Sequence, residues 1–156
     1  MAVWQVDFAI VPKRALAAKP RVPISGLIEA DWWSSERLPS EYTRHLSAIG
    51  PAGSSSTNEL QTWGKEDGNR VDVWFENGKP IRMIARVDVR RLDAKFGAML
   101  LQFVRTADAV LLRADGLVVE PLVGAFGAAL RTSAAWQYAT DPAASISSYS
   151  EPEDDE

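Results

Sequence analysis

The stretch that decides the fold covers residues 70–90 and reads RVDVWFENGKPIRMIARVDVR. Two runs of strand-forming residues, 70–75 and 81–89, flank the dipeptide Asn77-Gly78, which is the strongest short-range signal for a β-hairpin. Apolar and polar residues alternate in both runs, so each strand is expected to bury one face and expose the other. The sequence therefore predicts two antiparallel strands joined by a tight turn.

The alternation also decides the register of this hairpin, because a shift of one residue would move every side chain to the opposite face. A two-residue turn would place Val73 opposite Arg82 and Phe75 opposite Pro80. That register mixes apolar and charged groups on both faces, so we expect a different turn.

A three-residue loop at 76–78, with Gly78 in the left-handed conformation, separates the two kinds of side chain. The predicted cross-strand pairs are Val73 with Ile81, Val71 with Met83, Asp72 with Arg82, and Trp74 with Pro80. Ala85, Val87 and Val89 then continue the apolar face. The opposite face carries the charged residues Arg82, Arg86, Asp88 and Arg90.

Further strands are predicted on both sides of the hairpin. The turn signal Asp67-Gly68 follows a strand-like run at 60–65, which gives a three-stranded antiparallel meander. Residues 3–10 alternate and predict a half-buried strand. A third hairpin is expected at Ala114-Asp115-Gly116, and its short strands, 109–113 and 117–119, are apolar enough to be fully buried.

Two core helices are expected to pack against this sheet. Residues 92–107 lack proline and repeat apolar side chains at helical spacing. Pro121 suits the first position of a second helix that ends near Arg131. A shorter helix, from about Ser40 to Ala48 with Ser40 as its cap, is also predicted. The predicted fold class is α+β, an antiparallel meander sheet packed against two core helices.

The length of 156 residues predicts one domain. We expect residues 1–142 to form it, and residues 143–156, rich in serine and then acidic, to form a disordered tail. Loops are predicted at 12–23, which holds three prolines, and at 50–58, which is low in side-chain bulk.

The charge of the chain is concentrated at its C-terminal end. The net charge is −4, but residues 151–156 hold five of the 21 acidic residues, which leaves 16 against 17 Lys and Arg elsewhere. The body therefore has no net field that would recruit nucleic acid or an anionic membrane. Without a signal peptide pattern or an apolar run of about 18 residues, the sequence predicts a soluble, cytoplasmic protein.

The residues that usually carry chemistry are scarce. The chain has no Cys and a single His, His45, so neither a thiolate nor a multi-histidine metal site is expected. Neither a nucleophile turn nor a glycine-rich phosphate loop is present. Two carboxylate pairs, Glu29 with Asp31 and Asp72 with Asp88, have the residue types for acid–base work, although a solvated sheet face explains the second pair better. We expect no cofactor and no enzymatic activity.

The candidate partner-binding residues combine the charged sheet face with a pair of tryptophans. Arginine is favoured at protein interfaces, although an exposed face with weak ion pairs is the simpler interpretation. Trp32 and Trp33 are adjacent and would point in opposite directions if extended, so one of them is expected at the surface as an interface anchor. The predicted set is Trp32, Trp33, Asp72, Arg82, Arg86, Asp88 and Arg90.

Several short motifs give the chain a resemblance to small bacterial proteins, and they span about residues 30–142. The motifs are Asp31-Trp32-Trp33 with Leu38-Pro39, Trp63-Gly64 with Asp67-Gly68, residues 84–90, residues 115–121, and Ser133 with Asp141-Pro142. Those proteins resemble immunity-type factors found beside secreted bacterial toxins. The resemblance implies a chain that binds and blocks a cognate toxin without catalysis.

Three hypotheses remain open on the sequence. The first is a non-enzymatic protein-binding domain of immunity type. The second is a small enzyme or ligand-binding protein with a pocket between sheet and helices, in which Asp88 and Arg86 act as acid–base and anion-binding groups. The third is a homo-oligomer that buries the charged face against itself.

Overall fold

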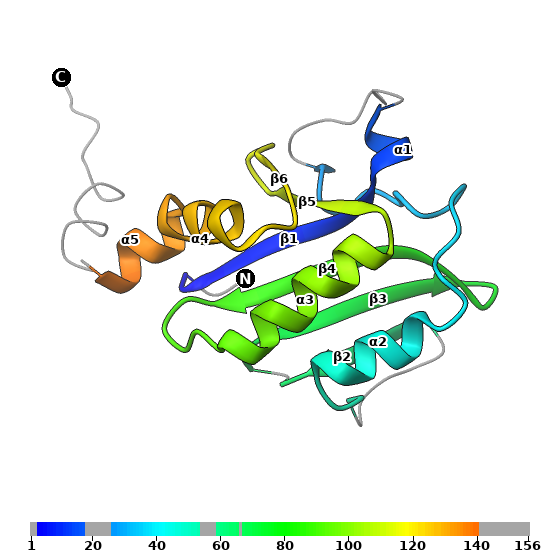
Figure 1. The fold of residues 1–156 in the computed structure, drawn as a ribbon, viewed down its shortest axis with the longest axis horizontal. Coiled ribbons are helices and arrows are strands. Elements are labelled where there is room, and N and C mark those ends of the chain that lie inside the picture. The colour runs from blue at the N-terminus through cyan, green and yellow to red at the C-terminus, as the bar shows by residue number, and fades with distance from the viewer. Residues whose placement is uncertain (1–2, 18–25, 54–58, 66, 141–156) are drawn as a thin grey trace, which may run out of the picture.

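The computed structural model describes residues 3–17, 26–53, 59–65 and 67–140. Within these ranges the chain forms a six-stranded antiparallel sheet (Figure 1). Its strands are β1 (Gln5–Pro12), β2 (Leu60–Gly64), β3 (Arg70–Glu76), β4 (Lys79–Asp88), β5 (Ala109–Arg113) and β6 (Val118–Val119). Their order across the sheet is β2-β3-β4-β1-β5-β6. The predicted α+β class is confirmed.

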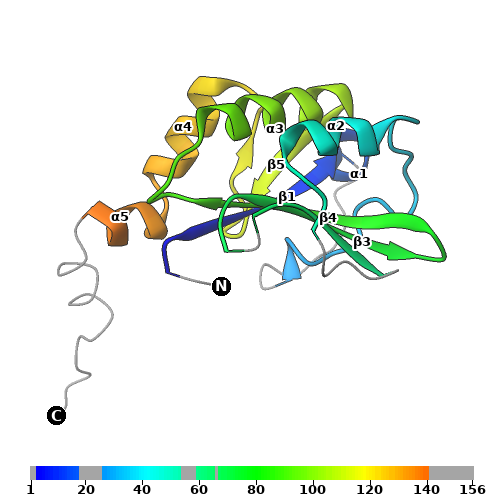
Figure 2. The same ribbon diagram turned by 90° about the horizontal axis from the view of Figure 1, so that it is seen from below.

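Helices cover one face of this sheet. The described helices are α1 (Lys13–Ala17), α2 (Tyr42–Ile49), α3 (Ala94–Thr106), α4 (Val123–Arg131) and α5 (Ala134–Thr140). Figure 2 shows α2, α3 and α4 on the same side, where the ring of Phe126 lies 5.6 Å from that of Phe8 on β1. The two predicted core helices correspond to α3 and α4, and α2 joins them in the same layer.

The sheet is a meander only in part. β2, β3 and β4 are neighbours in chain order, as predicted, but β1 lies between β4 and β5. This central position explains why all eight residues of β1 are buried, where the sequence predicted a half-buried strand. When a strand has neighbouring strands on both sides and packed layers on both faces, neither its odd-numbered nor its even-numbered side chains reach solvent.

The predicted three-residue loop of the central hairpin is wrong. Asn77 and Gly78 have φ values of 52° and 77°, and Glu76 pairs with Lys79, so the two residues form a type I′ turn. Phe75 therefore lies opposite Pro80, in the register that the alternation disfavoured.

A β-bulge immediately after this turn shifts the pairing of β3 and β4 by one residue, so their apolar side chains fall on the same face of the sheet. Phe75 pairs with Pro80 while Trp74 pairs with Arg82, which leaves Ile81 as an extra residue on β4. Beyond the bulge the cross-strand pairs are Val73 with Met83, Asp72 with Ile84, and Val71 with Ala85. The separation into an apolar and a charged face is as predicted, but the individual partners, including Asp72 with Arg82 and Trp74 with Pro80, are not.

Several predicted boundaries also change. The proline-rich loop begins with the short helix α1, and the remainder of that loop, 18–25, lies outside the described residues. The predicted loop at 50–58 starts beside β2, because Ala52 forms a β-bridge with Trp63; residues 54–58 lie outside the described ranges. α2 begins at Tyr42 after Glu41, so Ser40 is not its cap.

A segment of successive turns, residues 26–33, lies against the face of the sheet opposite the helices (Figure 2). Its apolar side chains pack against the core, and Trp33 donates its indole N–H to the carbonyl oxygen of Ile10 at 2.7 Å. The sheet is thus covered on both faces near β1. The predicted disordered tail, 143–156, lies outside the described residues.

Candidate functional site

The charged face of the sheet is built from ion pairs between neighbouring strands and within them. Arg86 on β4 donates Nε to Asp7 Oδ1 at 2.8 Å and Nη2 to Asp7 Oδ2 at 3.3 Å. On β3, the Nε of Arg70 lies 3.2 Å from the carboxylate of Asp72, which also accepts the hydroxyl of Thr62 at 2.8 Å. Asp7 and Asp72 are both buried, so each is a largely desolvated carboxylate with a guanidinium partner.

A third ion pair, between Asp88 and Arg90, lies at the end of β4. Asp88 is only 1% exposed, and its carboxylate accepts both the side chain and the backbone N–H of Arg90. Burial raises the pKa of Asp88, but the hydrogen bonds from Arg90 outweigh it and hold that pKa below the ordinary value for aspartate. Arg90 also stacks on Trp4, with its guanidinium carbon 3.8 Å from the ring centroid.

Arg82 occupies a different part of the sheet from these pairs. Its Nη2 lies 3.0 Å from Asp31 Oδ1, and its guanidinium lies 5.3 Å from the ring centroid of Trp74. The partner of Arg82 is therefore a residue of the segment 26–33, instead of the predicted Asp72. This pair ties the segment to the sheet near the bulge.

The predicted charged residues are thus held by internal pairs. Arg70 and Arg86 lie directly opposite each other on β3 and β4, and each one binds its own carboxylate. Arg86 binds Asp7 and Asp88 binds Arg90, so the two residues of the ligand-pocket hypothesis point to separate partners. The arrangement stabilises the sheet, and its charges largely compensate each other.

The two tryptophans are both buried, with exposures of 7% for Trp32 and 1% for Trp33. The prediction that one of them is a surface anchor is therefore wrong. Trp32 donates its indole N–H to the carbonyl oxygen of Leu27 at 2.7 Å, within the segment 26–33. Both rings serve to hold this segment against the sheet.

The residues that would bind a metal ion do not gather within the described ranges. No group of three or more His, Asp or Glu side chains there is arranged to hold a metal ion. His45 on α2 is partly buried, and its ring lies 6.4 Å from that of Phe103 on α3. Its contact is with the helix layer. Among the described helices, none is both long and apolar enough to cross a bilayer.

A patch of aliphatic side chains at the edge of the sheet was missed by the sequence analysis. We name it the aliphatic edge, and it comprises Leu117, Val118, Leu122 and Val123, with exposures of 42%, 45%, 57% and 78%. The first two lie at the edge strand β6, and the last two lie at the start of α4 (Figure 1). The run around β6 was predicted to be buried because it is apolar, but within the described part of the chain β6 has a neighbouring strand on one side only.

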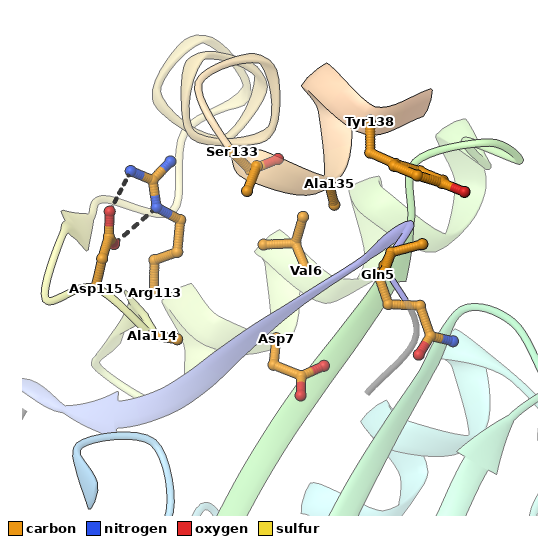
Figure 3. A pocket seen from close by; sticks show the side chains of 11 residues that line it. Gln5, Val6, Asp7, Arg113, Ala114, Asp115, Ser133, Ala135 and Tyr138 are labelled. Atoms are coloured by element: carbon orange, nitrogen blue, oxygen red, sulfur yellow. Dashed lines mark hydrogen bonds and ion pairs between the residues drawn. The ribbon is translucent and has the colours of Figure 1, made fainter. Parts of the chain in front are cut away.

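A pocket of about 340 Å³ opens on the other side of the β5–β6 turn. We name it the β1 slot, and it is bounded by residues 3 and 5–7, residues 113–115, and residues 133–135 with Tyr138. Figure 3 shows Val6 pointing toward Ser133 and Ala135 on one side of β1, whereas the side chains of Gln5 and Asp7 point to the other.

Neither a family model, nor a curated protein, nor a solved structure matches this sequence. Support for a function therefore comes from the contacts and surfaces described above.

Proposed function

We propose that this chain is a non-enzymatic protein-binding domain that contacts its partner through the aliphatic edge. The observation that carries the proposal is the exposure of four large aliphatic side chains within seven residues of the sequence. Exposed aliphatic side chains that lie close together in the chain favour an interaction site, because their removal from water drives association.

The position of the patch on the sheet supports this proposal. Among the described strands, β6 is the outermost and pairs with β5 alone, so its other side presents backbone groups beside the exposed side chain of Val118. Native proteins usually protect such an edge with charges, proline or a covering segment. A partner that covers this edge would bury apolar side chains and satisfy backbone groups together.

The resemblance to immunity-type factors supports a narrower proposal about the partner. In that proposal the chain acts in the cytoplasm, and the partner is a secreted bacterial toxin that it blocks by occlusion. The charged face contributes less than the sequence suggested, because its guanidinium groups already bind carboxylates of the same chain.

The experiment is a pull-down from the source cell with the full-length chain as bait, carrying either Leu122→Lys or Val123→Lys. Leu92→Lys is the matched control, because Leu92 is 52% exposed and lies outside the aliphatic edge. We expect wild type and Leu92→Lys to retain the same partner and both edge variants to lose it, with unchanged circular dichroism. Retention by the edge variants would contradict the proposal.

The narrower proposal needs the identity of the retained protein. Mass spectrometry should identify a toxin, and the purified toxin should lose its activity when the wild-type chain is added but keep it when Val123→Lys is added. A retained partner without toxic activity would contradict the immunity role and leave protein binding intact.

A further inference from the structure

β6 carries one backbone amide and one backbone carbonyl group that point away from the sheet. Arg113 on β5 donates its N–H to Leu117 O at 2.9 Å, so the backbone groups of Leu117 face β5. Successive residues of an antiparallel strand direct these groups to opposite sides. The N–H and C=O of Val118 therefore face outward, whereas those of Val119, which pairs with Leu111, face β5 again.

No described residue forms a hydrogen bond with these outward groups of Val118. Within the described ranges β5 is the one strand beside β6, and Val118 itself is 45% exposed. An unpaired N–H next to an unpaired C=O is the unit with which a further strand would pair. Val118 therefore marks a position where the sheet can be extended.

The stretch that can accept another strand is short, because the chain turns at both ends of β6. Gly116 has a φ of 96° in the turn between β5 and β6. After β6, Leu122 donates to Glu120 O at 2.7 Å, and Pro121 has no N–H to offer. A strand that pairs with Val118 therefore meets residues 117–119, which correspond to about 10 Å of edge.

Aliphatic side chains lie on both faces of the sheet at this position. Val118 pairs with Leu112, which in turn pairs with Ala9, so these three side chains share one face. The next residue along β1, Phe8, has the opposite parity, and its ring packs against α4. Val118 therefore points away from the helix layer, and Leu117 points toward it.

These features describe the kind of segment that fits. It needs free backbone groups to bond with Val118, and aliphatic side chains on both of its faces to cover Val118 on one side and Leu117 on the other. An extended segment has both properties. A helix does not, because its backbone groups are already bonded within the helix.

An exposed carboxylate adds a charge preference. Glu120 directly follows β6, and the described part of the chain holds no ion-pair partner for it. Other charges nearby are engaged: Arg113 pairs with Asp115 at 2.7 Å, and Arg105 donates to Pro121 O at 2.7 Å. A Lys or Arg near the end of an added strand would complement Glu120.

We propose that the partner adds a short extended strand to β6, through an aliphatic segment that carries a Lys or Arg near one end. The inference rests on the proposed function, because it states how the partner meets the aliphatic edge. The proposed function requires only that apolar side chains are covered. This inference adds hydrogen bonds to the backbone of Val118 and a cation beside Glu120.

Short peptides selected from a phage-displayed random library against the full-length chain serve as the probe. Val118→Pro removes the outward N–H, which an edge strand tolerates, whereas the matched control Val118→Ala keeps it and loses only side-chain contact. We expect Val118→Pro to bind the peptides about tenfold or more weakly than Val118→Ala does, with unchanged circular dichroism. Equal binding by the two variants would overturn the added strand.

NMR hydrogen exchange tests the same hydrogen bond without a substitution, so the proposal stays testable even if Val118→Pro does not fold. The Val118 amide should exchange faster than the Val119 amide in the free chain, because the latter faces β5. A bound peptide should increase the protection of the Val118 amide about tenfold or more. A Val118 amide that is protected before the peptide is added, or unchanged afterwards, contradicts the proposal.

The charge preference has its own test. The selected peptides should be enriched in Lys or Arg, and Glu120→Lys should weaken their binding about threefold or more. Glu76→Lys is the matched control, because Glu76 is also exposed but lies at the distant β3–β4 turn. If both variants bind as tightly as wild type, the preference for a cation is wrong.

The outcomes separate this inference from the proposed function. A library that yields no binder also overturns the added strand, yet the pull-down with Leu122→Lys and Val123→Lys can still succeed and would then indicate contact through side chains alone. If peptides protect Val118 but the pull-down yields no partner that depends on the aliphatic edge, the proposed function is refuted and the pairing at β6 stands.

Discussion

Trp33 donates its backbone N–H to the carbonyl oxygen of Ile81 at 3.0 Å. Ile81 is the extra residue of the bulge in β4, so its carbonyl group is released from the β3–β4 ladder at the point where the segment 26–33 arrives. The indole N–H of the same tryptophan binds Ile10 on β1. One buried residue therefore joins the bulged hairpin to the central strand.

Trp33→Phe should lower the free energy of unfolding by about 1–3 kcal/mol, because the carbonyl oxygen of Ile10 would lose a buried hydrogen bond. Urea unfolding followed by circular dichroism measures this loss. Trp32→Phe is the control, since its indole bond to Leu27 stays within one segment. If Trp32→Phe lowers the free energy of unfolding as much as Trp33→Phe does, the hydrogen bond to β1 does not contribute more than a bond within the segment, and the prediction is wrong.

The same substitution at two glycines should change stability in opposite directions. Gly78→Ala should destabilise the chain by about 1–2 kcal/mol, because Gly78 has a φ of 77° in the type I′ turn. Gly124→Ala should stabilise it by up to about 1 kcal/mol, because Gly124 lies in α4 with open space around it. Thermal unfolding of both variants tests the pair, and a stabilising Gly78→Ala would contradict the turn.

The pair Asp7–Arg86 should show strong energetic coupling. A double-mutant cycle with Asp7→Ala and Arg86→Ala should give a coupling free energy of about 1–3 kcal/mol, since removal of Arg86 leaves the buried carboxylate of Asp7 without its guanidinium partner. The pair Glu41–Arg44 is the control, and its coupling should be near zero because both side chains are well exposed. Equal coupling in both pairs would contradict the role assigned to burial.

Stability should fall as the solution becomes acidic, in part through Asp88. Because hydrogen bonds from Arg90 lower the pKa of Asp88 in the folded state, the pair stabilises the fold above the unfolded pKa, near 4. That contribution is lost as the pH falls through the lower, folded pKa. Urea midpoints measured from pH 7 downward should fall less steeply below about pH 4 for Asp88→Asn than for wild type.

Asp115 provides the comparison for this titration. The hydrogen bond from Arg113 also lowers the pKa of Asp115, so wild type should lose at least two such contributions in acid. Asp88→Asn removes one and Asp115→Asn removes the other. An identical pH profile for Asp88→Asn and wild type would refute the assignment for Asp88.

The charged face could be predicted from the sequence, whereas the turn that produces it could not. Residues two apart on β4, such as Arg82 and Arg86, share a face in any extended strand. Compared with a plain two-residue turn, a three-residue loop shifts the register of the hairpin by one residue, and so does a two-residue turn followed by one bulged residue. Either shift places the same side chains on each face. The pattern of side chains therefore cannot distinguish them, and the bulge at Ile81 depends on contacts with a distant segment.

The aliphatic edge and the β1 slot both depend on where strands end in space. The run at 117–119 is apolar enough for a core strand, and only its position at the sheet edge exposes Val118. The β1 slot arises because β5 turns at Arg113 while β1 continues to Gln5. Neither offset has a local signal in the sequence, because both follow from the pairing of distant strands.

The central position of β1 also determines the order in which this fold can be completed. Asp7 and Arg86 are 79 residues apart in the sequence, and the other neighbour of β1 comes later still. Closing such long loops costs entropy before the contacts form, so folds with many distant contacts form slowly. During synthesis, the apolar residues Phe8 and Ile10 must wait until β4 and β5 have emerged. Folding of the whole sheet is thereby tied to the last strands, and a nascent chain interrupted before β5 would display its future core to chaperones and proteases.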